Sequence, residues 1–551
     1  MNALLLAVCL LGAAPTPQPG PAWATAWKKG PMNADETKAF MKRLAQFVFD
    51  NHLKKNPDSP QRGMIYEYMD TTRKGQFDQF VQGEALDTMH DGAWFAAALV
   101  NAYRTTGDAF YKDFLTQWVL PFYLKMLNHS DELFTAKPIV GGVSTRRDTR
   151  DGDVPPTKTR DGDIPPTVPD AHRWGKEWLF QEGEKGFVPY FWDDGGSVSY
   201  ERRHSKKPLG AFQCVDNLAN KPNPNHLLDG YSLGSSNHMA QDLGVMLQLA
   251  WLLFKDSPAD EDKKLAAELA EAAKNLHECR MRHHGYIPMC VAPWALASGS
   301  AELMKRVPDP DDKALWNPSN HYTKALYDFE PGKPYSLPGF ADDQQYLYYH
   351  GIARAGGTLP RPLAFKTIYD AYTHPMLFRM YCDDWDVPPG INKFDLFPYQ
   401  MKDGKPTDYR SERKGPRGTV KPMGSRFGPQ NMIVCGWALQ ALKAHPGIWD
   451  ERLQHATRKD LRPYLTSSEA DVKAWLEREL GCGLRTWEAM FDEKGYIPTS
   501  LGSTYDWDKY SDTGGYAHLI SAAAQWLLYL EGKCDWEMHH IPQVLEKEEQ
   551  P

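Results

Sequence analysis

Residues 234–254 read GSSNHMAQDLGVMLQLAWLLF, and the second half of this stretch decides the fold. From Val245 to Phe254 nearly every side chain is apolar, so a helix formed here has no polar face to turn to solvent and must be buried on all sides. The first half carries Gly, Ser and Asn, residue types that begin helices. We therefore predict a buried helix over residues 238–255, with His238 in its first turn and with the cap residue types Ser235, Ser236 and Asn237 before it.

The same helical period recurs along the chain. Apolar residues at 265, 269, 272 and 276 line one face of a helix predicted over residues 260–279. Further helices are predicted at 35–53, 89–105, 109–127, 364–380, 430–444, 468–480 and 515–531. The helix predicted at 468–480 begins with a capping box, Ser468-Glu-Ala-Asp471, and Gly481 stands where this helix is expected to stop. Because the alternation typical of strands is scarce and short, the predicted class is all-α.

A short phrase repeats three times. Gly186-Phe-Val-Pro189, Gly285-Tyr-Ile-Pro288 and Gly495-Tyr-Ile-Pro498 share the order Gly, aromatic, β-branched, Pro, and their glycines are 99 and 210 residues apart. Glycine can end a helix in the left-handed conformation, and proline prevents the helix from continuing. Repeated helical hairpins would give this spacing, so we predict an (α/α) barrel, or toroid, in which each hairpin buries its face against its neighbours.

Long segments rich in Pro, Gly and aromatic residues separate the predicted helices, near 131–230, 305–345 and 383–428. Loops of this length usually have a function, and in a toroid they would wall a cleft on one face. One of them carries a tandem duplication, TRDGDVPPTK at 149–158 and TRDGDIPPTV at 159–168. Its Asp-Gly-Asp units could bind calcium, but their spacing matches no EF-hand loop, so a solvated surface loop is preferred.

The N-terminal residues predict export. Ala3 to Ala14 has the length of a signal-peptide core, and Ala24-Thr-Ala26 supplies a cleavage pattern. We predict a signal peptide over 1–26, a single catalytic domain over 27–551, and a secreted or periplasmic protein. Cleavage would leave seven cysteines without a C-x-x-C pair, which excludes a zinc ribbon and a dense disulfide scaffold. At most one or two disulfides are expected, and Cys279 with Cys290 is the only close pair.

Composition excludes several classes of partner. The chain has 551 residues, 42% of them hydrophobic, and a net charge of −8. A protein with this charge has no overall basic field for nucleic acid or an anionic membrane. No apolar stretch reaches the roughly 20 residues needed to span a bilayer. An acidic substrate would need a local cluster of cationic residues. No cofactor is predicted, and a metal requirement is left open.

One such cluster follows the buried hairpin. The segment Cys279-Arg-Met-Arg-His-His-Gly-Tyr286 holds two Arg, two His and one Tyr in a protein of negative charge. Simpler explanations exist for its members. Tyr286 occupies the aromatic position of the repeated phrase and could be a packing residue. Asn237 and the serines before it are ordinary cap residues, and a His in a first helical turn is often only exposed.

Together these residues suit β-elimination from a uronic-acid polymer. Removing the proton at C5 requires that the neighbouring carboxylate be neutralised, which Asn237, His238 and Arg280 could do. A base must take the proton, and an acid must protonate the O4 leaving group. Tyr286 can do both if the nearby Arg and His side chains lower its pKa from about 10. The same tyrosine serves both steps where the proton and the leaving oxygen are syn. His238 could share the base role.

An adjacent Asn-His pair in a toroid, followed by a tyrosine further along, resembles the toroidal polysaccharide lyases that act on alginate, heparin and related uronans. The Arg280 to Tyr286 spacing and the lack of a C-terminal β region are most similar to polysaccharide lyase family thirty-eight, whose members degrade glucuronan or alginate. The resemblance covers roughly residues 35 to 540 and implies that Tyr286 is base and acid, with Arg280, His238 and Asn237 around the carboxylate. The chain departs from the lyases that carry a second, β-sheet domain.

Other residues are candidates for substrate binding. The stretch EALDTMHDGAW at 84–94 opens another helix and offers His90, Asp91 and Trp94, the last of which could stack on a sugar face. Asp91 or Thr88 could instead be a cap. The remaining candidates for contact with the polysaccharide are Arg282, His284 and Arg426, together with the acidic run Asp383-Asp-Trp-Asp386.

Two alternatives to a lyase remain open. A glycoside hydrolase on the same toroid would use two carboxylates roughly 5 to 9.5 Å apart. Its candidates are Asp87 or Asp91 paired with Asp342, Asp343 or Asp383. The other alternative is a noncatalytic protein that binds glycans for polysaccharide uptake, which would release no oligosaccharides.

The first prediction concerns the proposed base and acid. Replacing Tyr286 by Phe removes only the hydroxyl, so we expect loss of most turnover with the fold intact. Initial rates on a polyuronate, together with circular dichroism, measure the two effects. Wild-type activity in Tyr286→Phe would contradict the assignment.

Overall fold

The computed structural model describes residues 21–57, 62–75, 78–82, 88–129, 185–186, 188, 191–192, 212–213, 238–283, 288–307, 343–382, 388–391, 399–402, 405–408, 427–453, 467–499 and 509–539. The described chain is mostly helical with a few short strands, which confirms the predicted dominance of helices. Closure of these helices into a toroid stays a prediction.

Most helices lie close to where the sequence predicts them. These are α2 (Ala34–Asn51), α3 (Thr88–Thr106), α9 (His238–Phe254), α10 (Asp260–His283), α15 (Arg361–Cys382), α16 (Phe427–Ala444) and α21 (Thr513–Glu531). The predicted helix at 109–127 consists of α4 (Ala109–Phe114), the π-helical turn η3 (Leu115–Val119) and α5 (Leu120–Asn128). The predicted apolar stripe of α10 is confirmed, because Leu269, Ala272 and Leu276 are buried.

Several elements were not predicted. The longer ones are α11 (Pro288–Ser298), α14 (Asp343–Arg354) and α20 (Gly483–Lys494). The short ones are α1 (Trp23–Ala26), η1 (Trp27–Lys29), α12 (Ala301–Met304), α17 (Ile448–Leu453) and η10 (Asp535–His539). The short strands are β1 (Tyr68–Lys74), β2 (Phe80–Gln82), β3 (Phe191–Trp192), β4 (Phe212–Gln213), β5 (Tyr399–Lys402), β6 (Lys405–Asp408) and β7 (Tyr510–Asp512).

Gly481 does not end a helix, contrary to the sequence prediction. The predicted capping box at Ser468 is present and begins α19 (Glu469–Glu477). The chain then passes through the π-helical turn η8 (Arg478–Cys482), which contains Gly481, and continues as α20. A Cβ on Gly481 would lie 2.7 Å from both Pro31 and Trp526. Glycine is therefore required here by close packing and not by a helix stop.

The repeated Gly-aromatic phrase does mark a helix end at Gly495. This residue follows α20 with φ of +78°, and its N–H donates to the Phe491 carbonyl at 2.7 Å. The left-handed stop predicted from the phrase is confirmed at this repeat. Gly186 also has a positive φ, of +80°, and a Cβ there would meet the Asn275 carbonyl at 2.0 Å. Gly285 lies outside the described residues.

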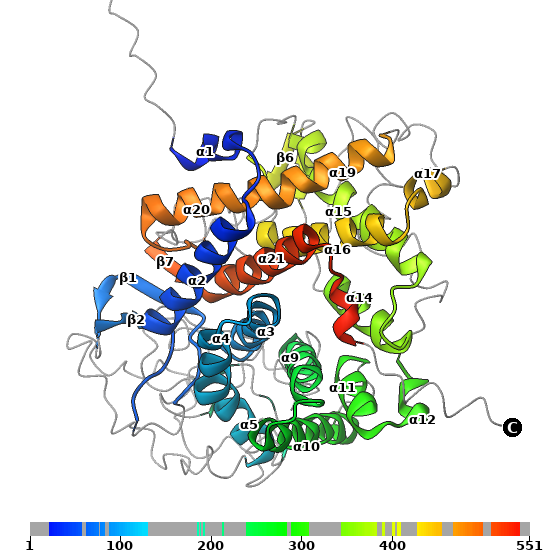
Figure 1. The fold of residues 1–551 in the computed structure, drawn as a ribbon. Helices are drawn as coiled ribbons and strands as arrows, with labels where there is room; N and C mark the ends of the chain where they lie inside the picture. Colours follow the sequence, from blue (N-terminus) through cyan, green and yellow to red (C-terminus); the bar gives the residue numbers. More distant parts are fainter. Residues whose placement is uncertain are drawn as a thin grey trace, which may run out of the picture.

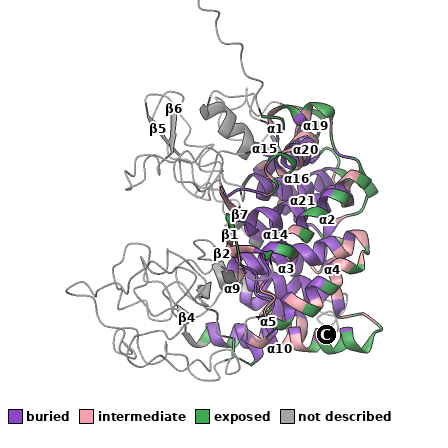
Figure 2. Ribbon diagram, turned by 90° about the vertical axis from the view of Figure 1, so that its left-hand side faces the viewer, coloured by how far each residue is buried: buried purple, intermediate pink, exposed green. Residues whose placement is uncertain are grey.

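Two layers of helices form the core. Helices α9, α3, α21 and α16 pack on one another in that order, and α11 packs on α9 (Figure 1). Around them, α2 packs on α21, α10 on α9 and α11, and α15 and α19 on α16. Residues of α3, α16 and α21 are buried along most of their length (Figure 2). Helix α9, whose side chains are apolar on nearly every side, is therefore an inner helix, as its composition predicts.

A small sheet ties the beginning of the chain to its end. Strand β1 pairs antiparallel with β2 on one side and β7 on the other, with Met69 opposite Ser511. The Thr513 N–H, at the first residue of α21, donates to the Glu67 carbonyl at 2.9 Å. Asp512 caps α21 by accepting from the Gly514 N–H at 2.9 Å. The sheet thus fixes where α21 begins.

The N-terminal described residues pack on the same domain. Helix α1 contacts α20, and the Ala22 N–H donates to Glu493 at 3.1 Å. Arg485 Nε donates to the Gly30 carbonyl at 2.7 Å. Residues 1–20 lie outside the described residues, so the signal peptide and its cleavage after Ala26 stay predictions.

A buried carboxylate, Asp535, joins the C-terminal halves of three inner helices. It forms an ion pair with Arg104 of α3 and accepts a hydrogen bond from Gln525 of α21 at 2.8 Å. Its own N–H donates to Gln440 of α16 at 2.6 Å, and the Gln440 amide donates to Gln525 at 2.8 Å. His539, 3.6 Å from Asp535, completes the group. One turn, η10, therefore links three helices.

Asp535 stays ionised although it is buried, because neighbouring side chains stabilise its negative charge. Burial alone would raise the pKa of the carboxyl, but Arg104, His539 and Gln525 lower it well below its ordinary value. A lowered pKa in the folded state means that this stabilisation is complete above about pH 3.9, the unfolded value, and is lost only as the pH falls toward the folded value.

Replacing Asp535 by Ala leaves the Arg104 guanidinium buried without its carboxylate. We expect the free energy of unfolding to fall by about 3–5 kcal/mol, measured by denaturant titration at neutral pH. Asp492→Ala is the control, because Asp492 pairs with Arg43 at the surface and is 54% exposed. Its loss should change stability by at most about 1 kcal/mol. Equal effects of the two substitutions would show that Asp535 does not hold the helices together.

Candidate functional site

The predicted site residues fall into three groups. Those with described side chains are His90, Asp91, Trp94 and Arg280. Those described by their backbone alone are His238 and Arg282. Those outside the described residues are Asn237, His284, Tyr286 and Arg426. The structure brings His90, Asp91 and Trp94 together in one cluster and places Arg280 near the beginning of α9.

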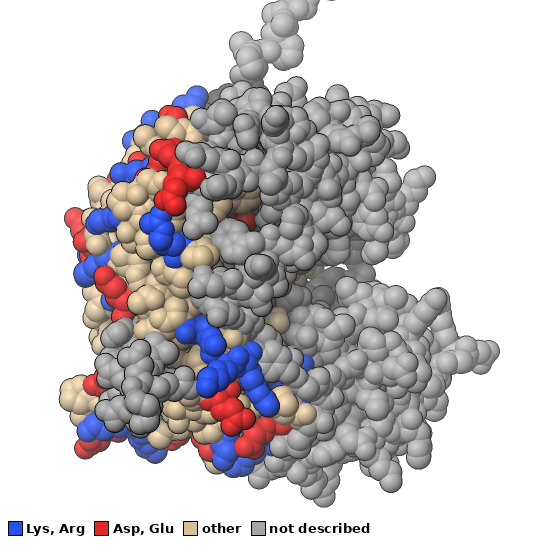
Figure 3. Space-filling view, turned by 90° about the vertical axis from the view of Figure 1, so that its right-hand side faces the viewer, with Lys and Arg blue, Asp and Glu red and all other residues tan. Residues whose placement is uncertain are grey.

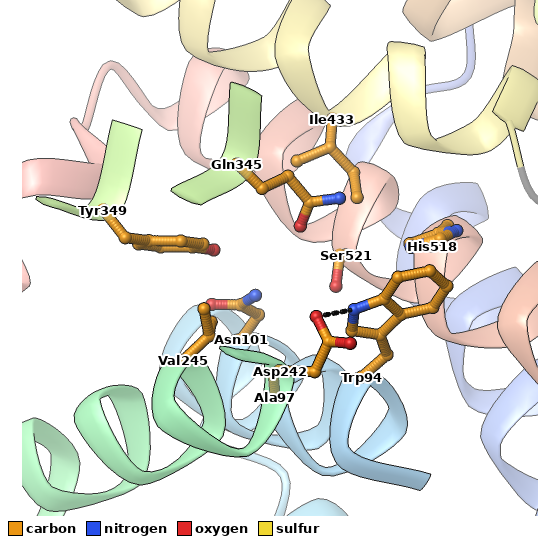
Figure 4. A pocket seen from close by; sticks show the side chains of 10 residues that line it. All are labelled: Trp94, Ala97, Asn101, Asp242, Val245, Gln345, Tyr349, Ile433, His518 and Ser521. Carbon is orange, nitrogen blue, oxygen red and sulfur yellow. Dashed lines mark hydrogen bonds between the residues drawn. The ribbon is translucent and has the colours of Figure 1, made fainter. Parts of the chain in front are cut away.

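The inner helices direct their N-terminal turns to one place. An internal cavity of about 20 Å³ is lined from the early turns of different helices (Figure 4). Its walls include Trp94 of α3, Asp242 of α9, Gln345 of α14, Ile433 of α16 and His518 of α21. These helices therefore begin at the same end of the molecule. Helix N-termini carry partial positive charge, so this end favours anions.

Asp242, which the sequence analysis did not select, is the centre of the cluster. One of its carboxylate oxygens accepts from the Trp94 indole N–H at 2.7 Å (Figure 4). The other lies 3.1 Å from Nε2 of His90. That second contact does not have hydrogen-bond geometry, and it is an ion pair when His90 is protonated. The Asp242 side chain is completely buried.

His90 lies between two carboxylates. Its Nδ1 is 2.9 Å from Asp91, the next residue of α3, and its Nε2 faces Asp242 across the helix interface. Asp91 is completely buried, and the His90 side chain is 6% exposed. Because α3 begins at Thr88, Asp91 lies inside the first turn and not at the cap position. The capping alternative for Asp91 is therefore not supported, and its contact with a substrate stays a prediction.

Trp94 packs between imidazole rings. Its ring centroid is 3.8 Å from that of His90 and 4.3 Å from that of His518. With 7% of its surface exposed and its N–H bonded to Asp242, the indole is fixed in place. It forms part of the site floor, and the stacking of a sugar on it stays a prediction.

The cavity wall continues inward as a polar surface. Asn101 lies two turns after Trp94 on α3, and Gln345 faces it from α14. Among the described residues, Asn101 Oδ1 and Gln345 Nε2 have no hydrogen-bond partner. The cavity has the volume of about one water molecule, which such groups commonly bind. Arg104, one turn further along α3, belongs to the Asp535 group, so polar residues follow the inner helices from one end to the other.

Arg280 lies at the end of α10, near the first turn of α9. Its charge acts on the thiol of Cys290, and that thiol donates to the Ala240 carbonyl at 3.5 Å. Burial raises the pKa of Cys290 to about 12, although Arg280 opposes the shift. Arg280 is itself 1% exposed. The hairpin thus brings positions 280 and 238 to the same end of the helix pair, as the sequence analysis required.

The expected close cysteine pair is not a disulfide. Cys279 and Cys290 are both buried thiols outside any disulfide, as are Cys435 and Cys482, and Cys534 is a partly buried thiol outside any disulfide. The Cys290 thiol donates a hydrogen bond to the Ala240 carbonyl of α9 instead of bonding to Cys279. The Asp-Gly-Asp repeats at 149–168 lie outside the described residues. Among the residues that are described, no group of three or more His, Cys, Asp or Glu is arranged to hold a metal ion.

Charges on the described surface are mixed. Lys and Arg alternate with Asp and Glu on the face that Figure 3 shows, without a large area of one sign among the described residues. In the same part of the chain no helix has both the length and the apolar composition of a membrane span.

Comparison of the chain with protein-family models, with curated proteins and with solved structures finds no match. The site is accordingly interpreted from its own chemistry.

Gly92 holds the cluster close to α5. A Cβ at this position would lie 2.0 Å from the hydroxyl of buried Tyr123 and 3.4 Å from Ile65. We expect Gly92→Ala to lower the free energy of unfolding by about 1–3 kcal/mol, because the added methyl overpacks the interface. Thermal or denaturant unfolding measures the change.

The double variant Gly92→Ala, Tyr123→Phe is the matched control. Removing the hydroxyl makes room for the methyl, so the double variant should be more stable than the sum of the two single changes indicates. Strict additivity would contradict the contact.

Proposed function

We propose that the protein is an exported polysaccharide lyase that cleaves a β-1,4-linked uronic-acid polymer, glucuronan or an alginate-like chain, by β-elimination on an (α/α) toroid. The observation that carries the proposal is the packing of the Arg280 end of α10 against the first turn of α9, through Cys290 and Ala240. This packing brings a buried cation near the position of His238, where the substrate carboxylate would bind.

The proposed reaction assigns one role to each residue. Asn237, His238 and Arg280 neutralise the uronate carboxylate, which makes the C5 proton acidic. Tyr286, as phenolate, takes that proton, and the electron pair left on C5 forms a double bond to C4. The bond from C4 to the glycosidic oxygen breaks, and the Tyr286 hydroxyl returns the proton to the leaving oxygen. Arg280 acts through its charge, since it is 1% exposed.

The inner helices support an anionic substrate in a second way. The beginnings of α3, α9 and α21 meet at the floor formed by His90, Trp94 and His518. Partial positive charge at helix N-termini favours a bound carboxylate. We assign His90, Asp91 and Trp94 to this floor, with Arg282, His284 and Arg426 as further contacts to the polymer.

A glycoside hydrolase remains the second candidate function, but Asp91 is poorly suited as one of its two catalytic carboxylates. Asp91 is fully buried and paired with His90, so it is poorly placed to protonate a glycosidic oxygen. The other carboxylates of that mechanism, Asp87, Asp342, Asp343 and Asp383, have no described side chains. A noncatalytic glycan-binding role is the third candidate.

One experiment separates the three. The purified full chain is incubated with glucuronan, polymannuronate, polyguluronate and a neutral β-glucan, and both ultraviolet absorbance and reducing ends are followed. A lyase creates a conjugated double bond, so we expect both signals to rise together on a polyuronate. Reducing ends without new absorbance would indicate a hydrolase. Binding without either signal would indicate a glycan-binding protein, and each of these two results contradicts the proposal.

A further inference from the structure

His90 has a carboxylate at each ring nitrogen. The Nδ1 contact to Asp91 is 2.9 Å and the Nε2 contact to Asp242 is 3.1 Å. A neutral imidazole has only one N–H and can donate to one carboxylate, whereas an imidazolium has two and can donate to both. In a neutral His90 one unprotonated ring nitrogen would lie beside a carboxylate oxygen, so the geometry favours one proton more than neutral His90 and two charged carboxylates hold. That proton sits either on His90 or on one of the two acids.

The surroundings favour His90 as its holder. Asp91 lies in the first turn of α3 and Asp242 is the fifth residue of α9, so the positive helix ends favour both carboxylates, although the same field of α3 opposes a charge on His90 in that turn. Asp242 also accepts from the Trp94 indole, a contact that stabilises its charged form. The imidazolium can in addition interact with the Trp94 ring, whose centroid is 3.8 Å away.

We propose that Asp242 is a positioning residue: together with Asp91 it holds His90 as an imidazolium, with the Nδ1 side hydrogen-bonded to Asp91 and the Nε2 side in ion-pair contact with Asp242, and it fixes the plane of Trp94. His90 then acts on a ligand through its position and charge and is not a base, because neither nitrogen has a lone pair. This corrects the simplest expectation for a histidine at a site floor. It also leaves Tyr286 and His238 as the groups for proton transfer. The effect on turnover rests on the proposed lyase function, but the state of His90 does not.

Asp242 connects this floor to the predicted reaction. Position 238 lies one helical turn before Asp242 on α9, and residues four apart share a face of a helix. The other titratable groups described near the cluster are His518 of α21, against Trp94, and Tyr123 of α5, near Asp91. Burial, reinforced by Asp91, raises the pKa of Tyr123 well above its ordinary value, so its phenol is neutral. The two aspartates are thus the anions that His90 meets.

The test uses two isosteric variants with opposite effects on the imidazole. In Asp242→Asn the new amide can still accept from Trp94, while its NH₂ donates to Nε2, so His90 should become the neutral tautomer protonated at Nδ1. In Asp91→Asn the same argument predicts the tautomer protonated at Nε2. Nitrogen-15 spectra of histidine-labelled full-length protein at neutral pH report each ring nitrogen, and a His90→Gln sample assigns the signals.

Asp262→Asn is the matched control, because Asp262 is also a largely buried carboxylate but pairs with Lys112 and Ser257 at the start of α10. It should leave the His90 signals as in wild type. On a polyuronate, Asp242→Asn should lower kcat by roughly tenfold or more, the size of effect known for residues that orient a functional histidine in metal sites. KM should change less than kcat, since Asp242 is buried and touches no substrate.

The outcomes separate the inference from the proposed function. A His90 that stays protonated on both nitrogens in Asp242→Asn and in Asp91→Asn would overturn the inference. Changed His90 signals with wild-type kcat would overturn the positioning role of Asp242. If the wild-type chain yields no unsaturated product from any polyuronate, the lyase proposal fails, while the nitrogen-15 spectra still decide the protonation of His90.

Discussion

The ion pair between Arg104 and Asp535 is the constraint on which the arrangement of the inner helices depends. A charged group inside a protein is tolerated only with a partner, and Asp535 finds partners on three helices at once. The contacts set how far α3, α16 and α21 slide along one another, because a shift by one turn would separate Arg104 or Gln525 from the carboxylate, or Gln440 from the Asp535 N–H. The register fixed at this end is transmitted along the rigid helices to their N-terminal turns.

At the N-terminal end the same helices present the candidate site. Trp94, Asp242 and His518 can meet only because α3, α9 and α21 begin at one level. Polar side chains are thus placed along the inside of helices that are otherwise apolar, from His90 past Asn101 to Arg104 on α3. A buried polar group is costly unless it has a hydrogen-bond partner in the right place, so these contacts hold the side chains in one arrangement. This makes the site rigid. The proposed chemistry uses that rigidity to hold a sugar carboxylate.

The sequence predicts much of the fold because the strongest signals are periodic. The apolar residues on all sides of α9, the apolar face of α10 and the capping box at Ser468 are local sequence patterns. Each of them is present in the structure as predicted. Gly481 was misread because its reason is a long-range contact with Pro31 and Trp526, which no local pattern contains. Within the site, His90, Asp91 and Trp94 were found as neighbours in sequence. Asp242 and His518 were missed because only folding makes them neighbours, although a lone acid in the apolar run of α9 was a usable signal.

The pairing of β1 with β7, and of α2 and α3 with α21, joins the first part of the chain to its last part. During synthesis the N-terminal helices leave the ribosome long before residues 509–539 exist. Until then the face of α3 that later meets α21 is without cover, and Arg104 is without Asp535. Nascent chains with uncovered apolar faces are prone to aggregate. Because residues 509–539 are translated after the helices that they cover, they complete this part of the core late, and the apolar faces of the earlier helices stay exposed until then.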